Sequence, residues 1–366
     1  MPAIRSGRMR RRVLVVGGGI GGLTAAVALR RAGLEVVVLE RAPEPRELGA
    51  GISLWPNAVN VLRQLGVGDA VQAVAVAQSD GGCRTWRGRR VADAPLAGTT
   101  ARHGPALLVL HRASLRAALS GALDRGVLQL SAECTSVDQD AKWVSVTLAD
   151  GRSVQGDVVI GADGVHSRVR AVTFGDEAPR YSGFTAWRGI VPLDDMLASR
   201  IQSAESWSRG GLFGLTQLGG SQAFWYAIAS ARENEGGFAA EEKAMLLRRF
   251  GYWHDPIPEL IEATAVEAIV RTSLYDRAPL ARWAAGRIAL LGDAARGMLP
   301  NLAQGGCQAI EDGAVLADAL RASSDSRHAL AAYDSHRREH AVKFARRSRR
   351  LSRLAHLQAR SGSGCG

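Results

Sequence analysis

Cysteine is scarce in this sequence, and the few cysteines present show no spacing typical of a metal site or a disulfide framework. Cys83, Cys134, Cys307 and Cys365 lie far apart, and no Cys-x-x-Cys pair occurs. Structural zinc sites and small disulfide-stabilised domains need closely spaced cysteines. No His, Cys and Asp cluster has the spacing of zinc ligands either. We therefore expect no metal and a reducing, cytoplasmic location.

Long apolar runs are also missing. A membrane-spanning helix needs about 18 or more consecutive apolar residues, and no such run occurs, so we expect no stable membrane insertion. Arginines before residue 13 superficially resemble the start of a secretory signal, but glycines interrupt the apolar stretch at residues 17–22. The length of 366 residues and the hydrophobic content of 46% predict a globular protein with two domains.

Acidic residues are fewer than basic ones, 35 against 46, which gives a net charge of +11. Much of the excess lies near the N-terminus and in residues 336–353, a run that includes Arg337. Such a surface could bind nucleic acid, but neither interleaved aromatics nor a known nucleic-acid module accompanies it. We expect a solvated, arginine-rich helix face and no nucleic-acid partner.

The stretch most informative about function is residues 13–26, where an apolar run turns at closely spaced glycines and continues with helical spacing. The pattern predicts a strand, a tight turn and a helix. Gly17 allows the turn, Gly19 lets the backbone approach a pyrophosphate, and Gly22 lets the helix pack closely on the strand. Glu40 ends the next apolar run, at the distance expected for an acid that binds a ribose hydroxyl. The pattern predicts a dinucleotide site and leaves FAD and NAD both open.

Other polar residues occupy places from which they could reach such a ligand. Arg41 and Arg46 follow the second apolar run and could each contact phosphate or ribose, or be solvated. Arg112 lies where a strand at 107–111 gives way to a helix, a favourable place for a cation that binds an anion. We expect Asn57 to cap the helix that follows it.

Two further acids end apolar runs. Residues 157–160 predict a buried strand, followed by a turn that carries Asp163. Residues 286–291 predict another strand, which ends at a turn with Asp293. An irregular loop then leads to a helix that starts near Gly305.

The middle of the chain, residues 177–267, predicts β-strands and holds most of the aromatic residues. A half-buried sheet that forms the wall of an apolar pocket has this composition. The register of each strand decides which side chains face the pocket. The substrate-binding candidates are Phe213, Gln217, Tyr226 and Met298.

Three motifs stand together in this chain: Gly17-x-Gly19-x-x-Gly22, residues 161–164 and residues 292–293. In this order and separation they resemble the FAD-dependent aromatic monooxygenases, the flavoprotein hydroxylase group that includes p-hydroxybenzoate, salicylate and urate hydroxylases. The resemblance covers roughly residues 12–350. Supporting stretches are residues 49–52, 56–58, 187–189 and 300–312.

The resemblance implies an α/β fold, α+β overall. We expect a Rossmann-like FAD-binding domain with the GxGxxG turn, an inserted substrate domain with a mostly antiparallel sheet, and a long C-terminal helix. The expected boundaries are 1–75, 102–176 and 268–322 for the FAD-binding domain, 76–101 and 177–267 for the substrate domain, and 323–366 for the C-terminal helix and tail.

The resemblance also implies the reaction. FAD would be the cofactor and NAD(P)H and dioxygen the co-substrates, and a flavin C4a-hydroperoxide would hydroxylate an aromatic or polycyclic small molecule. By the same resemblance Glu40 would hold the adenosine ribose, and Arg112 would approach the ribityl-phosphate. Asp293 would bind the ribityl or pyrophosphate region, and Asp163 would serve FAD positioning and the NAD(P)H-linked step.

The reacting end of the flavin would lie near the helix that starts at Gly305 and Gly306. The N–H groups and positive dipole end of that helix can stabilise charge at the N1/C2 edge of reduced flavin. The catalytic candidates are Pro300 and Arg188. Pro300 would lie over the flavin ring, or only shape its loop. Arg188 would orient the substrate or flavin, or form a structural ion pair.

Three positions depart from the family pattern. Relatives often carry His-Pro or a similar pair where this chain has Arg296 and Gly297, and Gly where it has Ala303. We expect Arg296 to bring a cation near the flavin and substrate, where it would favour an anionic substrate or stabilise reduced flavin. The alternatives are an FAD-dependent epoxidase, reductase or dehydrogenase that acts on a lipid-like substrate, and a catalytically silent flavin-binding protein. A monomer or a homodimer is expected.

Overall fold

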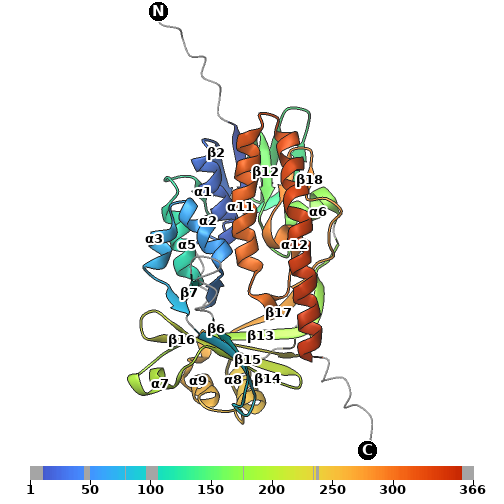
Figure 1. The fold of residues 1–366 in the computed structure, drawn as a ribbon. Helices are drawn as coiled ribbons and strands as arrows, with labels where there is room; N and C mark the ends of the chain where they lie inside the picture. Colours follow the sequence, from blue (N-terminus) through green and yellow to red (C-terminus); the bar gives the residue numbers. More distant parts are fainter. Residues whose placement is uncertain are drawn as a thin grey trace, which may run out of the picture.

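The computed structural model describes residues 11–44, 50–78, 80–95, 106–175, 177–233, 235 and 239–356. An upper half, built around a parallel sheet, lies on a lower half built around a second sheet, and the long C-terminal helix runs down one side of both (Figure 1). None of the helices in these ranges combines the length and the apolar character that crossing a membrane requires.

The upper sheet has six strands in the order β18-β19-β12-β1-β2-β8, and every neighbouring pair except β18 and β19 is parallel. The central strands are buried on both faces, which explains their continuous apolar sequences. The strands expected at the glycine turn and before Asp163 and Asp293 are therefore confirmed. Their bounds are β1 Arg12–Val16, β2 Glu35–Leu39, β8 Leu128–Gln129, β12 Val158–Gly161, β18 Ala284–Ala285 and β19 Ile288–Leu290.

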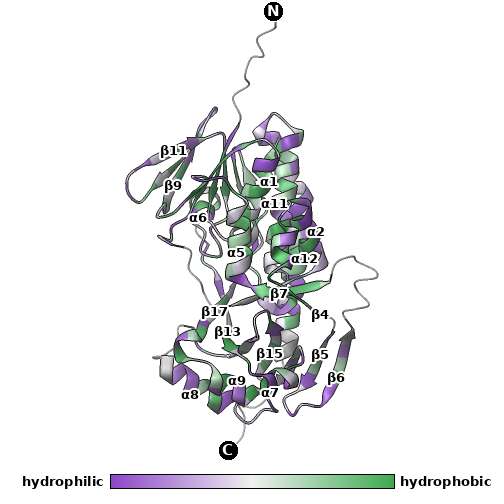
Figure 2. Ribbon diagram, turned by 90° about the vertical axis from the view of Figure 1, so that its left-hand side faces the viewer, coloured by the Kyte–Doolittle hydropathy of each residue, from purple (hydrophilic) through white to green (hydrophobic). Residues whose placement is uncertain are grey.

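Helices and two small sheets complete the upper half. Figure 2 shows α1 and α11 next to each other, each with many apolar positions, and they pack together along their length. The helices are α1 Ile20–Arg31, α2 Pro56–Gln64, α3 Gly68–Gln72, α5 Arg112–Gly121, α6 Arg168–Phe174, α10 Gly292–Arg296 and α11 Gly305–Ala322, with a 3-10 turn, η2, at Pro300–Leu302. The small sheets are β3 Gly51–Leu54, β7 Leu107–His111 and β4 Val76–Gln78, and β9 Cys134–Gln139, β10 Val144–Leu148 and β11 Ser153–Gly156.

Asn57 does not cap helix α2, contrary to expectation. The helix begins at Pro56 with Trp55 in the capping position, and proline suits the first helical position because its missing N–H would have no intrahelical partner there. The Asn57 amide instead donates to Glu311 Oε1 at 2.7 Å and to Gln304 Oε1 at 3.3 Å.

The lower sheet has seven strands in the order β17-β13-β16-β15-β14-β5-β6, and all pairs except β14 and β5 are antiparallel. The expectation of a mostly antiparallel sheet is confirmed. Its strands are β5 Asp80–Thr85, β6 Arg90–Pro95, β13 Arg180–Pro192, β14 Ala204–Ser208, β15 Gly211–Leu218, β16 Gln222–Ser230 and β17 Val270–Asp276. Beneath it lie α7 Asp195–Arg200, α8 Ala239–Phe250 and α9 Ile257–Ala263 (Figure 1). The 3-10 turn η1, Val266–Ala268, follows α9 in the chain.

The two faces of the lower sheet meet different parts of the molecule. On the helix-covered face, Trp225 and Phe213 stack with ring centroids 5.4 Å apart, in a core shared with α8 and α9. On the other face, Tyr226 belongs to apolar clusters that include Leu299 and Val109 of the upper half. This second face is therefore the one that borders the upper half.

Phe213 and Gln217 are on the wrong face to line a pocket between the two halves, so both pocket assignments are wrong. Phe213 is fully buried against the lower helices. Gln217, four residues further along β15, faces the same way and donates from Nε2 to the Ala198 carbonyl of α7 at 3.0 Å. Successive strand residues alternate between the two faces of a sheet. The sequence alone does not show which of the two sets faces the lower helices.

The C-terminal helix is α12, Ser326–His356. Arg337 is only 5% exposed, so the expectation that it belongs to a solvated helix face is wrong. It turns inward because two carboxylates of α11 face it. The domain boundaries stay a prediction; β4 pairs with β7, and β5 joins the lower sheet.

Candidate cofactor and substrate site

The glycine turn between β1 and α1 admits only glycine at two positions. Gly17 has a φ of +108°, and a Cβ there would lie 2.5 Å from the Ala162 carbonyl oxygen. A Cβ on Gly22 would overlap the carbonyl oxygen of Gly17. At Gly19, by contrast, an added Cβ would meet nothing within 4 Å. The turn is therefore closely packed on its inner side and open at Gly19.

Two adjoining cavities open at this turn. One, of about 570 Å³, is lined by residues that include Gly17, Gly19, Glu40, Arg41 and Asp163. The other, of about 520 Å³, shares Gly19, Glu40 and Arg41 and is also lined by Arg112. The structure thus brings together predicted residues from four separate stretches of the chain. Arg46 lies outside the described residues.

Glu40 is held at the carboxyl end of β2 by two backbone donors. Its Oε2 accepts from Gly18 N at 2.6 Å, and its Oε1 accepts from Ala42 N at 2.9 Å. A carboxylate oxygen can accept two hydrogen bonds, so each oxygen can still accept one from a ligand hydroxyl.

Asp163 has a structural role as well as a place in the cavity wall. It accepts from Ser167 Oγ at 2.6 Å, from Arg168 N at 2.7 Å and from Val169 N at 3.1 Å, and so holds the start of α6. Burial raises the pKa of its carboxyl, and these hydrogen bonds partly oppose that rise. These three hydrogen bonds fix the position of the Asp163 carboxyl group.

Asp293 lies in the first turn of α10, directly after the upper sheet ends at β19. Its side chain is exposed to solvent, yet enough protein surrounds it for desolvation to raise the pKa of its carboxyl. The positive charges of Arg296 and Arg112 oppose this rise.

Arg296 does not bring its charge to the flavin and substrate side, so that expectation is wrong. Its side chain is 2% exposed, and its Nη2 lies 3.0 Å from Asp312 Oδ2. The guanidinium carbon lies 5.8 Å from the centre of the Trp283 ring, a buried residue of the upper core. A buried carboxylate on α11 therefore determines where this arginine points.

The start of α11 is close to the loop that carries the proline candidate. A Cβ on Gly305 would lie 3.8 Å from Met298 Cγ, and one on Gly306 would lie 2.9 Å from Ile52 Cδ1. The first turn of α11 contains no acidic residue that would neutralise its positive end. Pro300 begins the half-buried turn η2, and Ala303 follows it in the left-handed conformation, with a φ of +49°.

On the lower sheet, Arg188 of β13 lies directly opposite Tyr226 of β16. Arg188 donates from Nη1 to Thr272 Oγ1 at 3.2 Å. Burial, and next the charge of Arg112, lower the pKa of its guanidinium. The charge of Arg112 also opposes the rise in the pKa of the Asp293 carboxyl.

Tyr226 reaches across β15 to a carboxylate that the sequence did not indicate. Its hydroxyl donates to Glu205 Oε1, and Glu205 Oε2 accepts from Trp207 Nε1 at 2.9 Å. The path crosses Gly214, where any Cβ would overlap the tyrosine ring. Burial, with the charge and hydrogen bond of Glu205, raises the pKa of the Tyr226 hydroxyl well above its usual value. Only the strand register, which pairs Glu205 with Gly214 and Gly214 with Tyr226, shows this relationship.

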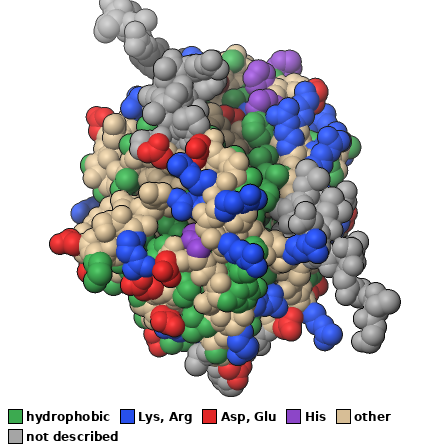
Figure 3. All heavy atoms as spheres, turned by 60° about the horizontal axis from the view of Figure 1, so that its bottom comes forward, with side chains coloured by type: hydrophobic (Ala, Val, Ile, Leu, Met, Phe, Trp, Pro, Cys, Tyr) green, Lys and Arg blue, Asp and Glu red, His purple; other side chains and the backbone are tan. Residues whose placement is uncertain are grey.

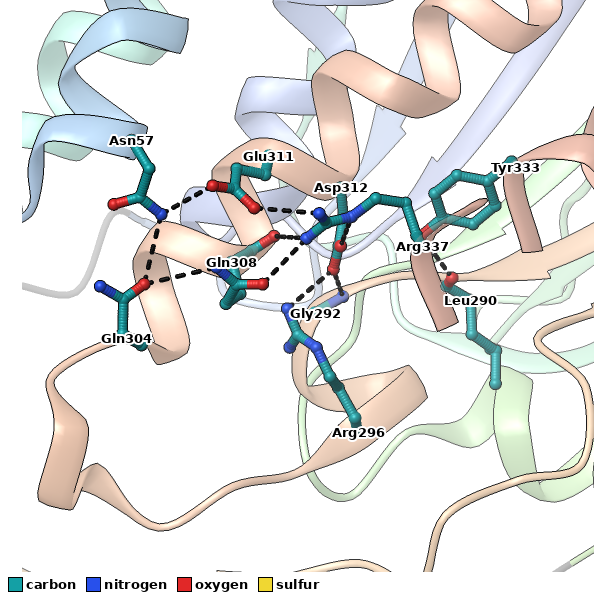
Figure 4. Close-up of polar contacts among 10 residues, drawn as sticks. All are labelled: Asn57, Leu290, Gly292, Arg296, Gln304, Gln308, Glu311, Asp312, Tyr333 and Arg337. Atoms are coloured by element: carbon teal, nitrogen blue, oxygen red, sulfur yellow. Dashed lines mark hydrogen bonds and ion pairs between the residues drawn. The ribbon is translucent and has the colours of Figure 1, made fainter. Parts of the chain in front are cut away.

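A buried polar cluster behind the cofactor side was also missed (Figure 4). Asp312 of α11, fully buried, accepts from Gly292 N, Arg296 and Arg337. Glu311 and Asp312 were part of the family stretch at residues 300–312, but no role was assigned to them. The available signal was two adjacent acids, Glu311 and Asp312, in a mostly apolar helix.

Exposed basic side chains occur at several places on the face seen in Figure 3, with acidic side chains between them. Along α12 several of the basic residues pair with acids: Arg338 with Asp334, Lys343 with Glu339 and Arg349 with Asp276. Within the described ranges, no group of three or more His, Cys, Asp or Glu side chains is arranged to hold a metal ion. Cys83, Cys134 and Cys307 are free thiols.

Comparisons with known proteins agree with this geometry. Residues 10–348 match the family model described as an FAD binding domain. The chain is 42% identical over 342 residues to an aurachin C monooxygenase/isomerase of Stigmatella aurantiaca, a match that spans 93% of this chain and 89% of the relative. It is 36% identical to a 3-amino-4-hydroxybenzoate 2-monooxygenase of Streptomyces cremeus, over 94% of this chain and 88% of the relative.

A solved structure has the same fold. The crystal structure of Klebsiella pneumoniae HpxO complexed with FAD and uric acid superposes with a TM-score of 0.89 at 31% identity. The superposition covers 94% of this chain and 89% of HpxO.

Proposed function

The chain belongs to the family of FAD-dependent aromatic monooxygenases, and we propose that it uses NAD(P)H and dioxygen to hydroxylate an aromatic or polycyclic small molecule. The observation that carries the proposal is the convergence of Gly19, Glu40, Arg112 and Asp163 on adjoining cavities at one glycine turn. These residues come from stretches that are far apart in the chain, so their meeting reflects the fold rather than local sequence.

The residues at the turn fit the adenosine diphosphate part of FAD. A pyrophosphate needs close approach to backbone N–H groups at a helix start, and the open side of Gly19 at the start of α1 offers this. A ribose needs a hydrogen-bond acceptor, and Glu40 retains free acceptor capacity. Arg41 and Arg112, both exposed at the cavities, would balance phosphate charge.

We assign the other half of the cofactor to the region near Asp293 and the start of α11 at Gly305 and Gly306. Bound FAD would supply the redox and oxygen chemistry. The protein would hold the ribityl chain with Asp293 and stabilise negative charge with the positive end of α11. Asp163 would keep the adjacent backbone in place through the start of α6.

We assign the substrate to the face of the lower sheet that borders the upper half. Arg188 and Tyr226 lie side by side on that face, between apolar clusters that contain Leu299 and Val109. Arg188 would donate hydrogen bonds to an acceptor on the substrate, and Tyr226, fixed by Glu205, would contact its ring. Pro300 and Met298 would contribute from the loop above. Apolar surroundings with a few polar groups are typical of small-molecule sites.

The relatives support the class of substrate. Their names refer to aurachin C and 3-amino-4-hydroxybenzoate, and HpxO was crystallised with uric acid. We propose an aromatic small molecule for this chain, a cytoplasmic location and no nucleic-acid partner.

A panel of candidate aromatics tests the proposal. The purified FAD-loaded protein is mixed with NADH or NADPH and each compound, and oxidation of the nicotinamide is followed at 340 nm. We expect at least one aromatic compound to raise the rate above that of the protein alone, and the variant Arg188→Met to respond less. Failure of FAD to bind, or equal rates with and without every compound, would contradict the proposal.

A further inference from the structure

We propose that Arg337, on the C-terminal helix, is a positioning residue for the flavin site: it acts through Asp312 and Glu311 to hold the segment that carries Asp293. The inference rests on the cofactor site assigned above. Arg337 itself lines neither cavity at the glycine turn. Its effect would pass through buried hydrogen bonds that the close-up in Figure 4 draws.

Asp312 is the centre of these contacts. Its Oδ2 accepts from Gly292 N at 3.1 Å and from Arg296 Nη2 at 3.0 Å, and its Oδ1 accepts from Arg337 Nε at 2.8 Å. The bond to Gly292 N matters most for the cofactor, because Gly292 immediately precedes Asp293 and has a left-handed φ of +59°. Glycine adopts this conformation without strain, and the hydrogen bond from its N–H to Asp312 attaches the turn to α11.

Arg337 uses all three of its nitrogens on α11. Besides the bond to Asp312, its Nη1 lies 2.9 Å from Glu311 Oε2, and its Nη2 donates to Gln308 Oε1 at 3.0 Å. The planar guanidinium suits several acceptors arranged around one plane, which a lysine could not match. Arg337 therefore holds two consecutive turns of α11 against α12.

The contacts continue to the first turn of α11. Glu311 accepts from Asn57 on α2, and the same amide donates to Gln304, the residue that caps α11. Gln308 Nε2 also donates to Gln304 Oε1, at 3.4 Å. A shift of Arg337 would therefore reach the helix start that we assign to the flavin.

Helix α12 also binds both ends of the segment that carries Asp293, residues 290–299. The Tyr333 hydroxyl donates to the Leu290 carbonyl at 3.0 Å, and Ser348 Oγ donates to the Leu299 carbonyl at 2.6 Å. Helix α12 therefore contacts this segment at three places. It binds Leu290 before Asp293 and Leu299 before Pro300, and through Asp312 it is linked to the turn at Gly292. Arg337 occupies the middle of these three attachments.

The cluster is electrically balanced. Arg296 and Arg337 face the carboxylates of Glu311 and Asp312, and all but Glu311 are almost fully buried. Removing one cation from a buried pair leaves an uncompensated charge. Loss of Arg337 would place an unbalanced negative charge behind the Gly292 turn and release Asp312 from α12.

The adjacent residue provides a matched control. Arg338 also lies on α12 and pairs with an acid, Asp334, at 2.8 Å, but it is more than a third exposed and touches none of the cluster. Arg337→Gln and Arg338→Gln remove the same charge from neighbouring positions of one helix. Only the first should disturb the cofactor site.

The measurement is the dissociation constant of FAD from the apo-protein, followed by quenching of flavin fluorescence at a temperature below the melting point of every variant. We expect Arg337→Gln to weaken FAD binding about tenfold or more, and Arg338→Gln to leave it within about twofold. Arg337→Lys, which keeps the charge without the planar fork, should fall between them. The visible spectrum of bound FAD should shift in Arg337→Gln alone.

If Arg337 only stabilises the fold, Arg337→Gln will lower the melting temperature, and FAD affinity measured below that temperature will be unchanged. That result would overturn the proposal. If Arg337→Gln does not fold, Arg337→Lys decides: wild-type affinity in that variant also overturns it. Failure of wild-type protein to bind FAD would instead contradict the proposed function, so the two failures are distinguishable.

Discussion

The guanidinium of Arg296 and the carboxylate of Asp312 form a buried ion pair, with Nη2 and Oδ2 3.0 Å apart. The pair explains how the chain accommodates an arginine directly after the Asp293 turn. The cation is turned into the core, where α11 supplies its partner, rather than towards the cofactor.

Replacing Arg296 with methionine should therefore affect stability first. The change leaves Asp312 with a single cationic partner, Arg337, in a buried site, and we expect a loss of about 3 kcal/mol in the free energy of unfolding. Urea denaturation of the apo-protein measures it. Arg321→Met, at an exposed pair with Asp318, is the control and should change stability by less than about 0.5 kcal/mol. Equal effects of the two substitutions would contradict the buried-pair account.

Tyr226→Phe should change substrate binding without changing FAD binding. The substitution removes the hydrogen bond to Glu205 and lets the ring move, and we expect the KM of the best substrate to rise about tenfold. The FAD dissociation constant should stay within about twofold, because Tyr226 lies on the lower sheet. Thr185→Val, on the helix-covered face of β13, is the control for general damage. A Tyr226→Phe enzyme with a wild-type KM would exclude Tyr226 from the substrate wall.

The stability of the apo-protein should depend on pH through Asp293. Its pKa is raised in the folded state, so the folded protein retains a proton that the unfolded chain has already released. Stability therefore falls as pH rises from the ordinary aspartate pKa through the raised one, and is level above it. Melting temperatures at a series of pH values, for wild type and Asp293→Asn, measure this. The melting temperature of Asp293→Asn should not fall over this pH range. If the melting temperatures of the two proteins change with pH in parallel, Asp293 does not titrate in this way.

Replacing Ala303 with glycine should stabilise the protein. It has a φ of +49°, a conformation that costs a residue with a Cβ about 1 kcal/mol and costs glycine little. Ala303→Gly should therefore raise the free energy of unfolding by about 1 kcal/mol, as measured by urea denaturation. Ala122→Gly, at a helix end with ordinary φ, should not stabilise. Destabilisation by Ala303→Gly would show that the methyl group makes compensating contacts.

Much of the upper half was predictable because its signals are local. The turn at Gly17 and Gly22 and the acids that end β2 and β19 are visible in a few consecutive residues, and parallel strands bring their carboxyl ends to one edge of the sheet.

The wrong predictions concern side chains whose positions depend on contacts between segments far apart in the chain. Phe213 and Gln217 were assigned to the wrong face because the phase of a strand depends on what packs on each side. Arg296 is expected near the flavin and Arg337 on a solvated helix face, whereas both pair with Asp312 on α11, a contact that their local sequence does not reveal. Glu205 meets Tyr226 only through the register of three strands.

The most direct test of the account follows the oxygen atom. The FAD-loaded protein is supplied with NAD(P)H and the aromatic compound that most stimulates its oxidation, under labelled dioxygen, and the product is analysed by mass spectrometry. The account predicts a hydroxylated product with one atom of label from the gas. A product whose new oxygen comes from water, or consumption of NAD(P)H without any oxygenated product, would contradict it.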